Sequence, residues 1–599
     1  MAHTPETIKQ RISQLRDHMR ANSISATIIP QTDPHLGEYL ADHWQVRRWL
    51  SGFTGSAGDL VVTLDRAFIW ADSRYWLQAA AQLQDTGIEV MEDGKPEVPS
   101  IAQWLCANLA PGSTVGIDGM LFSDIATADL AATLAAKQIN LRVDFVPAAI
   151  WTDRPSLPLA PIFLHDEKYA GESATSKIAK ILAAAAEAGA NSMFISDLAE
   201  IAWTLNIRSR DVESNPVVTS FLLISPQGST LFTAPEKITP EVAAALAAAK
   251  VSVAPYDTVV TALSSLPASA RVLVSPTQTA GAVTSLLASR AVRAASPVAM
   301  LKGCKNDIQI AGVRQAMERD GVAMVRSLIE IENALAAGTP ITELTIAEIL
   351  TRHRSAQPLY FDQSFDTIAG FGPHGAIVHY SATPQTSVTI TPDNLLLIDS
   401  GANYLDGTTD ITRTITLGNT TDQQRTDFTL VMQGHIALAT AIFPEGTRGA
   451  QLDALARMPL WKHGLSYLHG TGHGVGHFLN VHEGPQSIRL NENPTPLTPG
   501  MITSDEPGVY RAGEYGIRCE NLILTIPAMT TEFGRFYAFE VLTLCPFDLR
   551  LFDTSIMSDA EIAWVNDYHA TVRRRLSPLL TPNERTWLEA KTTPLTRAK

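Results

Sequence analysis

Several features that define other classes of protein are scarce or missing in this sequence of 599 residues. It has only four cysteines, Cys106, Cys304, Cys519 and Cys545, which are far apart and form no CxxC pair. This spacing indicates neither a disulfide framework nor a thiolate zinc site, so we expect a reducing compartment. No apolar run approaches the roughly 20 residues of a membrane-spanning helix. The first residues also lack the apolar stretch typical of a signal peptide, and we therefore expect a cytoplasmic protein.

Basic residues are outnumbered by acidic ones. The chain has 46 Lys and Arg against 61 Asp and Glu, which gives a formal net charge of −15. An excess of negative charge disfavours nucleic acid or an anionic membrane surface as a partner. Only 18% of the residues are charged and 45% are hydrophobic, as suits a large folded protein rather than a disordered one.

Two stretches in the first half of the chain show the same order of patterns. Each begins with a helical pattern, continues with a short apolar run (26–29 and 193–195) and a second helical pattern, and then has a hairpin pattern (60–70 and 221–232). We interpret these stretches as two copies of one α/β module. The alternative, that any two α/β stretches look alike, stays open at this point.

Changes in composition predict four segments. A proline-rich stretch at 152–161 separates the two modules, because proline interrupts helices and strand ladders. A long amphipathic helix over 308–336 opens a third domain, and the tail has a helical pattern at 558–576 before a Pro- and Thr-rich end that we expect to be frayed. The predicted segments are 1–155, 156–305, 306–545 and 546–599.

Histidines are concentrated in the third domain. Eight of the 15 histidines lie between residues 374 and 482, where a uniform distribution would place about three. Such a concentration indicates metal binding or proton transfer.

Two aspartates in the same domain are attached to apolar strand patterns. Asp399 ends the run 395–399, and Asp410 lies inside a β-branched pattern at 408–417, with turn residues between them. A hairpin would place the two carboxylates side by side. Two acids among apolar residues repel each other and lose hydration, and a cation between them removes both penalties.

Further acids and one histidine complete a candidate metal site. Glu506 follows an apolar run, and Glu520 lies in the strand pattern 516–525. Taken singly, each acid is better explained as a solvated loop residue or a structural ion pair. Taken together, four carboxylates and a histidine match the needs of two divalent ions and reverse that preference.

The histidine ligand is expected from the glycine-rich segment 469–477, which we predict as a tight loop or strand edge. Its four glycines would make a helix costly. The segment does not satisfy a dinucleotide-binding GxGxxG, because His477 takes the place of the last glycine. Nor is the segment that follows a zinc-binding HExxH, because Gln486 stands where the second histidine is needed.

With these residues in place, the third domain resembles the metallopeptidases of pita-bread fold, most closely the three-domain aminopeptidase P (Xaa-Pro aminopeptidase) group. The matching segments are GFGPHGAIVHYSA (370–382), DSGANYLDGTTDITRT (399–414), HGTGHGVGHFLNVHEGP (469–485), MITSDEPGVY (501–510) and YGIRCENLI (515–523). Upstream, GFTGSAG (52–58) and DSRYWLQA (72–79) resemble the first domain of that group. The resemblance implies an α/β (α+β) fold with two creatinase-like N-terminal domains, a C-terminal pita-bread catalytic domain and a helical extension.

The resemblance also implies the ligands and the reaction. Two metal ions would be bound by five residues, the same set that charge and strand position suggest: Asp399, Asp410, His473, Glu506 and Glu520. Mn²⁺ is the usual metal of the group, and Zn²⁺, Co²⁺ or Fe²⁺ would also fit these ligands. The implied reaction is hydrolysis of the bond between an N-terminal residue and a proline at position two. Our mechanistic hypothesis is that a metal-bridging hydroxide attacks the scissile carbonyl, with Glu506 accepting and then donating the proton.

Other residues receive roles from the same resemblance. His379 and His482 would contact the substrate, and His469 would shape the pocket beside the metal-binding loop. Arg518 could orient a metal-binding carboxylate through its bidentate fork and lie against the substrate. Arg74, in the first domain, either reaches the substrate or forms a structural ion pair.

Cys519 stands where the group usually has an aliphatic residue, which would put an oxidisable thiol beside the site. The implied partners are a peptide with proline at position two and a second copy of the chain in a homodimer. Two alternatives are less favoured. A prolidase, which cleaves only dipeptides, does not suit the long duplicated N-terminal half, and a non-catalytic pita-bread protein would typically lack some of the five ligands.

Overall fold

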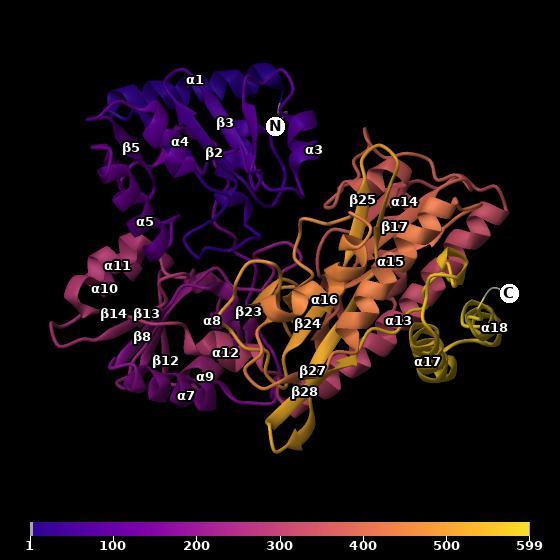
Figure 1. Ribbon diagram of the computed structural model, residues 1–599. Coiled ribbons are helices and arrows are strands. Elements are labelled where there is room, and N and C mark those ends of the chain that lie inside the picture. The colour runs from indigo at the N-terminus through magenta and orange to yellow at the C-terminus, as the bar shows by residue number, and fades with distance from the viewer. Residues whose placement is uncertain (1–3, 598–599) are drawn as a thin grey trace. The chain divides into compact units, whose positions relative to one another are not determined.

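The computed structural model describes residues 4–597, and the chain forms two compact units (Figure 1). The first unit contains the chain up to Glu167 and Glu172–Val298, and the second contains Lys168–Gly171 and the chain from Ala299 onward. Among residues 4–597, no helix combines the length and the apolar character that a membrane span requires.

The first unit contains two six-stranded sheets with the same topology. Their strand orders are β4-β3-β2-β1-β5-β6 and β12-β11-β10-β8-β13-β14. In each sheet a central strand pairs antiparallel with the first strand of a hairpin on one side and parallel with a further strand on the other. The strands are β1 (Ala26–Ile29), β2 (Asp59–Thr63), β3 (Ala67–Ala71), β4 (Glu89–Glu92), β5 (Thr114–Gly116) and β6 (Asn140–Arg142), then β8 (Ser192–Ile195), β10 (Phe221–Ile224), β11 (Ser229–Phe232), β12 (Val251–Ala254), β13 (Val272–Val274) and β14 (Ala291–Arg293). The predicted duplication of one module is confirmed.

Helices cover these sheets, and one of them differs from the prediction. The main helices are α1 (Pro5–Ala21), α2 (Val46–Ser51), α3 (Trp76–Gln82), α4 (Ile101–Asn108), α5 (Asp124–Ala135), α7 (Ala174–Glu187), α8 (Leu198–Leu205), α9 (Pro240–Ala248), α10 (Val259–Ser264) and α11 (Gly281–Leu287). In the second module α8 begins soon after β8, as expected. In the first module residues 31–40 form no helix, and α2 begins only at Val46. Pro30 and Pro34 explain this difference, because proline lacks the N–H that a helix needs.

The longest helix of the second unit is α13 (Asp307–Ala336), close to the predicted 308–336. Asn306 caps this helix, since its side chain accepts a hydrogen bond from the Gln309 backbone N–H at 3.0 Å. The two main sheets of the unit are ordered β16-β17-β20 and β21-β28-β27-β24-β22-β23, and two small sheets have the orders β15-β18-β19 and β25-β26. The other helices are α12 (Pro297–Gly303), α14 (Glu343–Ser355), α15 (Asp422–Ala439) and α16 (Gly449–Trp461). The strands are β15 (Tyr360–Gln363), β16 (Ile368–Phe371), β17 (Leu395–Ser400), β18 (Ala402–Tyr404), β19 (Gly407–Thr408), β20 (Ile411–Thr416), β21 (Phe443–Pro444), β22 (Gly472–Gly474), β23 (Glu483–Ile488), β24 (Ile502–Asp505), β25 (Gly508–Arg511), β26 (Tyr515–Arg518), β27 (Asn521–Thr531) and β28 (Gly534–Val541).

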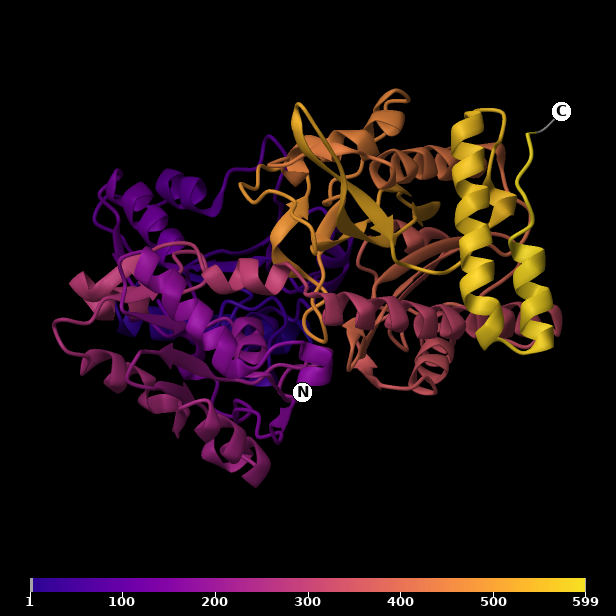
Figure 2. The same ribbon diagram turned by 90° about the horizontal axis from the view of Figure 1, so that it is seen from below.

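Up to residue 597 the tail is more ordered than expected; residues 598 and 599 of the expected frayed end lie outside the described residues. The predicted helix is present as α17 (Asp559–Leu576), but a further helix, α18 (Pro582–Lys591), takes the place of the expected frayed segment. Both helices pack against α13 (Figure 2). Glu332 of α13 accepts hydrogen bonds from Trp587 Nε1 at 2.7 Å and from Lys591 Nζ at 2.6 Å. Pro582 starts the helix rather than breaking it, because proline is tolerated in the first turn.

We predict that Trp587→Ala detaches α18 locally. Losing the half-buried indole and its hydrogen bond should cost about 2 kcal/mol. Amide hydrogen exchange within α18 should therefore accelerate roughly 30-fold, since each 1.4 kcal/mol is a factor of ten. Arg585→Ala, an exposed position of the same helix, is the control and should leave exchange unchanged. Equal exchange in both variants would show that Trp587 does not anchor the helix.

Candidate metal centre

Two neighbouring strands bring the aspartates together. Asp399 lies in β17, and Asp410 immediately precedes β20, which pairs antiparallel with β17 so that Asp399 is opposite Thr412. The expected continuous strand over 408–417 is interrupted, because β18 and β19 turn aside into a small sheet with β15. Both aspartates are buried, with exposed fractions of 8% for Asp399 and 4% for Asp410.

Both glutamates lie at breaks between strands. Glu506 separates β24 from β25, and its backbone N–H donates to the Thr471 carbonyl at 2.8 Å. Glu520, one of the last residues before β27, donates its N–H to the Thr412 carbonyl at 3.1 Å. The hydroxyl of the same threonine donates to Glu520 Oε2 at 2.8 Å. The backbone on either side of each acid is thus fixed by the sheets.

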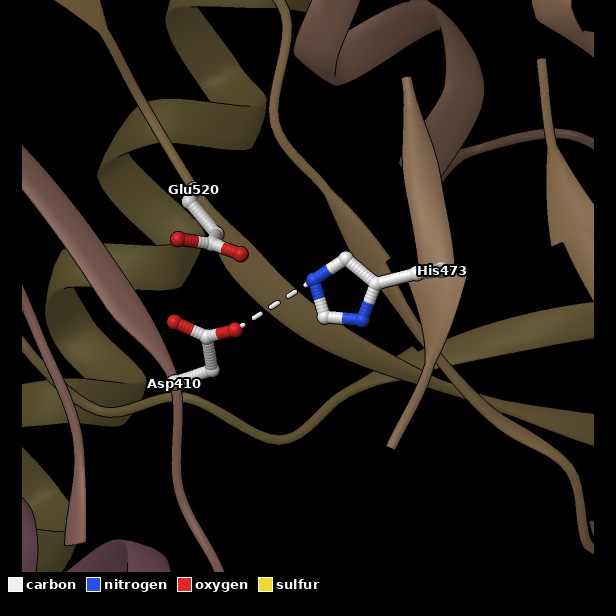
Figure 3. A group of neighbouring side chains, drawn as sticks. All are labelled: Asp410, His473 and Glu520. Carbon is white, nitrogen blue, oxygen red and sulfur yellow. Dashed lines mark ion pairs between the residues drawn. The ribbon is translucent and has the colours of Figure 1, made fainter. Parts of the chain in front are cut away.

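His473 occupies the middle of β22, which is a strand as the glycine content predicted, and not a helix. Its Nδ1 lies 2.9 Å from the Gly474 carbonyl, which can only accept, so Nδ1 carries a proton. Its Nε2 faces the acids, 3.4 Å from Asp410 Oδ2 and 3.6 Å from Glu506 Oε1. Asp410, His473 and Glu520 each offer a ligand atom, and these atoms lie within 4.8 Å of one another (Figure 3).

The charges of this cluster are poorly solvated. Burial raises the pKa of Asp399, the Asp410 carboxylate adds to the effect, and the Arg518 guanidinium opposes it. Burial also raises the pKa of Glu506 to about 7 and holds the pKa of Glu520 well above its usual range. For His473, burial lowers the pKa, but the facing carboxylates outweigh it and raise the pKa to about 9. The cluster therefore has more negative charge than its surroundings neutralise.

The residues fit divalent metal ions. Asp399 Oδ1 and Glu520 Oε1 are buried and have no hydrogen-bond partner within residues 4–597. A buried carboxylate oxygen without a donor is costly, and a cation is the partner that removes this cost. Oxygen ligands with one imidazole suit Mn²⁺ and related divalent ions. Whether these five residues are the ligands stays a prediction that this geometry favours.

Arg518 lies behind Asp399 and differs in detail from the prediction. Its Nη2 donates to Asp399 Oδ2 at 2.5 Å, its Nη1 to the Tyr510 hydroxyl at 2.9 Å and its Nε to the Thr412 hydroxyl at 3.2 Å. The expected bidentate fork on one carboxylate is absent, and the guanidinium divides its N–H groups among three partners. The Tyr510 hydroxyl is also 2.8 Å from His469 Nε2.

Sequence reasoning missed two of these partners. Tyr510 is the last residue of the matched segment 501–510, and Thr412 lies two residues after Asp410 in the matched segment 399–414. The position of both residues in these segments was therefore visible in the sequence. Neither side chain has a charge that would draw attention to it.

Three further residues, His482, His379 and Arg74, were assigned contacts with the substrate by the family resemblance, for Arg74 as one of two alternatives. The His482 ring is edge-on to the His473 ring, with centroids 4.4 Å apart. His379 is half-buried in a turn. Arg74, in the first compact unit, donates to both oxygens of Asp72 at 2.9 and 2.7 Å, which is the ion-pair alternative considered for it. The substrate roles of these three residues stay predictions.

Cys519 is fully buried, with an exposed fraction of 0%. Burial raises the pKa of its thiol to about 12. Because the thiolate is the form that oxidants attack, the structure argues against the expected oxidation sensitivity.

Comparison with known families covers nearly the whole chain. The model of metallopeptidase family M24 matches residues 311–526, and that of the C-terminal region of peptidase M24 matches 535–595. Two models of the creatinase/prolidase N-terminal domain match 11–142 and 153–309.

Relatives match over at least 90% of their length. Aminopeptidase P2 of Arabidopsis thaliana is 40% identical, with 100% of this chain and 90% of the relative covered. The probable Xaa-Pro aminopeptidase P of Coprinopsis cinerea is 39% identical, with 99% of each covered. The crystal structure of X-prolyl aminopeptidase from Caenorhabditis elegans, described as a cytosolic enzyme with a di-nuclear active site, is 33% identical over 99% of this chain and 100% of that chain, with a TM-score of 0.94. The predicted resemblance and fold class are confirmed: the chain belongs to metallopeptidase family M24, in the aminopeptidase P group, with two creatinase-like N-terminal domains before a pita-bread domain.

Proposed function

We propose that this chain is a metal-dependent Xaa-Pro aminopeptidase, which releases the N-terminal residue from peptides with proline at position two. The observation that carries the proposal is the buried cluster of four carboxylates around His473, in which Asp399 Oδ1 and Glu520 Oε1 have no donor among the described residues. The match to relatives named for this activity, over 90% and 99% of their length, supports it.

Two divalent ions would be held by Asp399, Asp410, His473, Glu506 and Glu520. We propose Mn²⁺ as the native metal, and a di-nuclear site agrees with the description of the Caenorhabditis elegans relative. Bound ions of this kind lower the pKa of water and polarise a carbonyl. The Gly474 carbonyl supports the histidine, because it fixes the ring with Nε2 directed toward the acids.

Glu506 is proposed to take a proton from the attacking water and return it to the leaving nitrogen. Its side chain is 18% exposed, so it is less enclosed than Glu520, with an exposed fraction of 1%. Burial brings the pKa of Glu506 close to neutrality, where a group both accepts and donates protons readily.

The neighbouring histidines are proposed to bind the substrate. His482 borders the His473 ring, so it can donate a hydrogen bond to the scissile carbonyl as charge develops there. His469 is held by the Tyr510 hydroxyl, which orients its ring beside the centre. We assign His379 a substrate contact by family resemblance, and we place the free amino terminus of the peptide near Asp410.

The setting of the enzyme is also a proposal. We propose a cytoplasmic location, in keeping with the relative described as cytosolic. We propose a homodimer as well, which a molar mass measured by light scattering would test.

The substrate assignment predicts which peptides are cleaved. An Arg-Pro-Pro tripeptide should lose its first residue, whereas a tripeptide with alanine at position two should react at least tenfold more slowly. Mass spectrometry of the products is the measurement, and enzyme stripped with a chelator is the control. Cleavage of an Xaa-Pro dipeptide alone would instead identify a prolidase.

Glu506→Gln should reduce kcat by a factor of about 10²–10⁴, the usual contribution of general acid–base catalysis. The amide keeps the volume of the side chain but cannot accept the proton. Glu514→Gln, an exposed position four residues before Arg518, is the matched control and should retain full activity. Circular dichroism should show the same fold in both. Activity above half of the wild-type value in Glu506→Gln would refute the role.

Metal binding should weaken as pH falls. His473 must lose the proton held with a pKa of about 9, and Glu506 one held with a pKa of about 7. The apparent Mn²⁺ affinity, measured by calorimetry from pH 8 to pH 6, should therefore fall at least tenfold, with protons released on binding.

The same pKa values have the opposite effect on the metal-free protein. The usual pKa values are 4.5 for Glu506 and 6.5 for His473, and both are raised in the folded state. The folded state then binds more protons than the unfolded chain, so the metal-free protein should lose stability as pH rises from about 5 to 9. A metal affinity and a melting temperature that are both independent of pH would contradict this electrostatic account.

A further inference from the structure

A short segment without helix or strand links α16 to the metal centre. Residues Tyr467–Thr471 include His469 and lead directly into β22, which contains His473. Such a segment has no ladder of backbone hydrogen bonds, so other groups must satisfy and fix its carbonyls.

Arg457 of α16 supplies these groups. Its Nη1 donates to the Tyr467 carbonyl at 2.6 Å and its Nη2 to the His469 carbonyl at 2.8 Å. The guanidinium carbon also lies 3.9 Å from the centroid of the Tyr467 ring. The arginine side chain is buried, with an exposed fraction of 1%. A planar guanidinium holds two carbonyls in one fixed geometry, which a lysine ammonium cannot reproduce.

Asp453, one turn earlier on α16, completes the arrangement. It accepts a hydrogen bond from Arg457 Nε at 2.5 Å through Oδ2 and one from the Thr471 hydroxyl at 2.6 Å through Oδ1. The Tyr467 hydroxyl lies 2.5 Å from the same threonine hydroxyl. Asp453 and Thr471 both have exposed fractions of 0%. Arg457 and Asp453 therefore hold both ends of the segment by hydrogen bonds, Arg457 at Tyr467 and Asp453 at Thr471.

Residues of this segment form hydrogen bonds to groups at the candidate metal centre. The Thr471 carbonyl accepts the backbone N–H of Glu506 at 2.8 Å. His469 meets the Tyr510 hydroxyl at 2.8 Å, and that hydroxyl accepts from Arg518. A shift of the segment would thus move a proposed substrate histidine and the backbone of the proposed base together.

We infer that Arg457 and Asp453 are positioning residues, which set His469, His473 and Glu506 in mutual register by fixing the segment Tyr467–Thr471. This inference rests on the proposed function for its catalytic consequence. Its structural part depends only on hydrogen bonds to the segment.

The inference predicts a specific loss in Arg457→Lys, which keeps the charge and removes the planar fork. Mn²⁺ affinity, measured by calorimetry on the full chain, should fall about tenfold or more, the usual effect of losing a group that orients a ligand. With an Arg-Pro-Pro tripeptide, kcat should fall at least tenfold while KM changes less than about threefold. Arg11→Lys is the control, because Arg11 is also buried, donates to a carbonyl (Trp49, 2.7 Å) and stacks on an aromatic ring, but lies in the first unit. It should keep both values.

A second pair of variants tests the same link if Arg457→Lys fails to fold. Thr471→Val removes the hydroxyl that binds Asp453 and keeps the side-chain shape, so Mn²⁺ affinity and kcat should fall severalfold. Thr471→Ser restores the hydroxyl and should recover both. Wild-type affinity and kcat in Arg457→Lys, or equal values in the two Thr471 variants, would overturn the inference. Failure of the wild-type enzyme on Xaa-Pro peptides would refute the proposed function instead, and the Mn²⁺ titrations would still test the positioning role.

Discussion

Four carboxylates packed around one imidazole form the constraint on which the catalytic unit depends. Carboxylates this close to one another repel when they are charged, and burial removes the water that would weaken the repulsion. Within the described chain, one arginine, Arg518, reaches Asp399 directly, and two carboxylate oxygens of the cluster lack any donor. The polypeptide alone leaves the cluster under-neutralised, so the same arrangement that destabilises the metal-free protein favours the binding of cations.

Three of these acids lie at breaks between strands. Asp410, Glu506 and Glu520 each stand at a break, where a strand has just ended or is about to begin. Residues on both sides stay in register with neighbouring strands, so the position of each acid is fixed although its own backbone is outside the ladder. An acid in the middle of a continuous strand would instead alternate with its neighbours between the two faces of the sheet. The breaks allow these three acids, from separate segments, to face the same centre as Asp399, which lies inside β17.

The sequence was enough to predict the acids but not the groups that hold them. Carboxylates at the ends of apolar runs or inside strand patterns are visible along the chain, which is why Asp399 and Asp410 were expected side by side and Glu506 was expected to join them. The hydrogen bonds of Arg457 to the Tyr467 and His469 carbonyls depend on how α16 packs against a segment without regular structure. The hydrophobic periodicity of the sequence does not predict such packing. The helix α18 was missed for a similar reason, since its stability comes from packing against Glu332 of α13, far away in sequence.

The glycines of the histidine-rich segment do more than disfavour a helix. Their cost in a helix predicted a strand or loop, and β22 is a strand. The structure adds a stronger requirement. A Cβ on Gly472 would lie 1.9 Å from the Ser504 carbonyl oxygen, and one on Gly474 would lie 2.2 Å from the Glu483 carbonyl oxygen. Side chains at either position would push the neighbouring strands apart. Because His473 lies between these two glycines, the close approach that they permit is also what brings its ring within reach of Asp410 and Glu506.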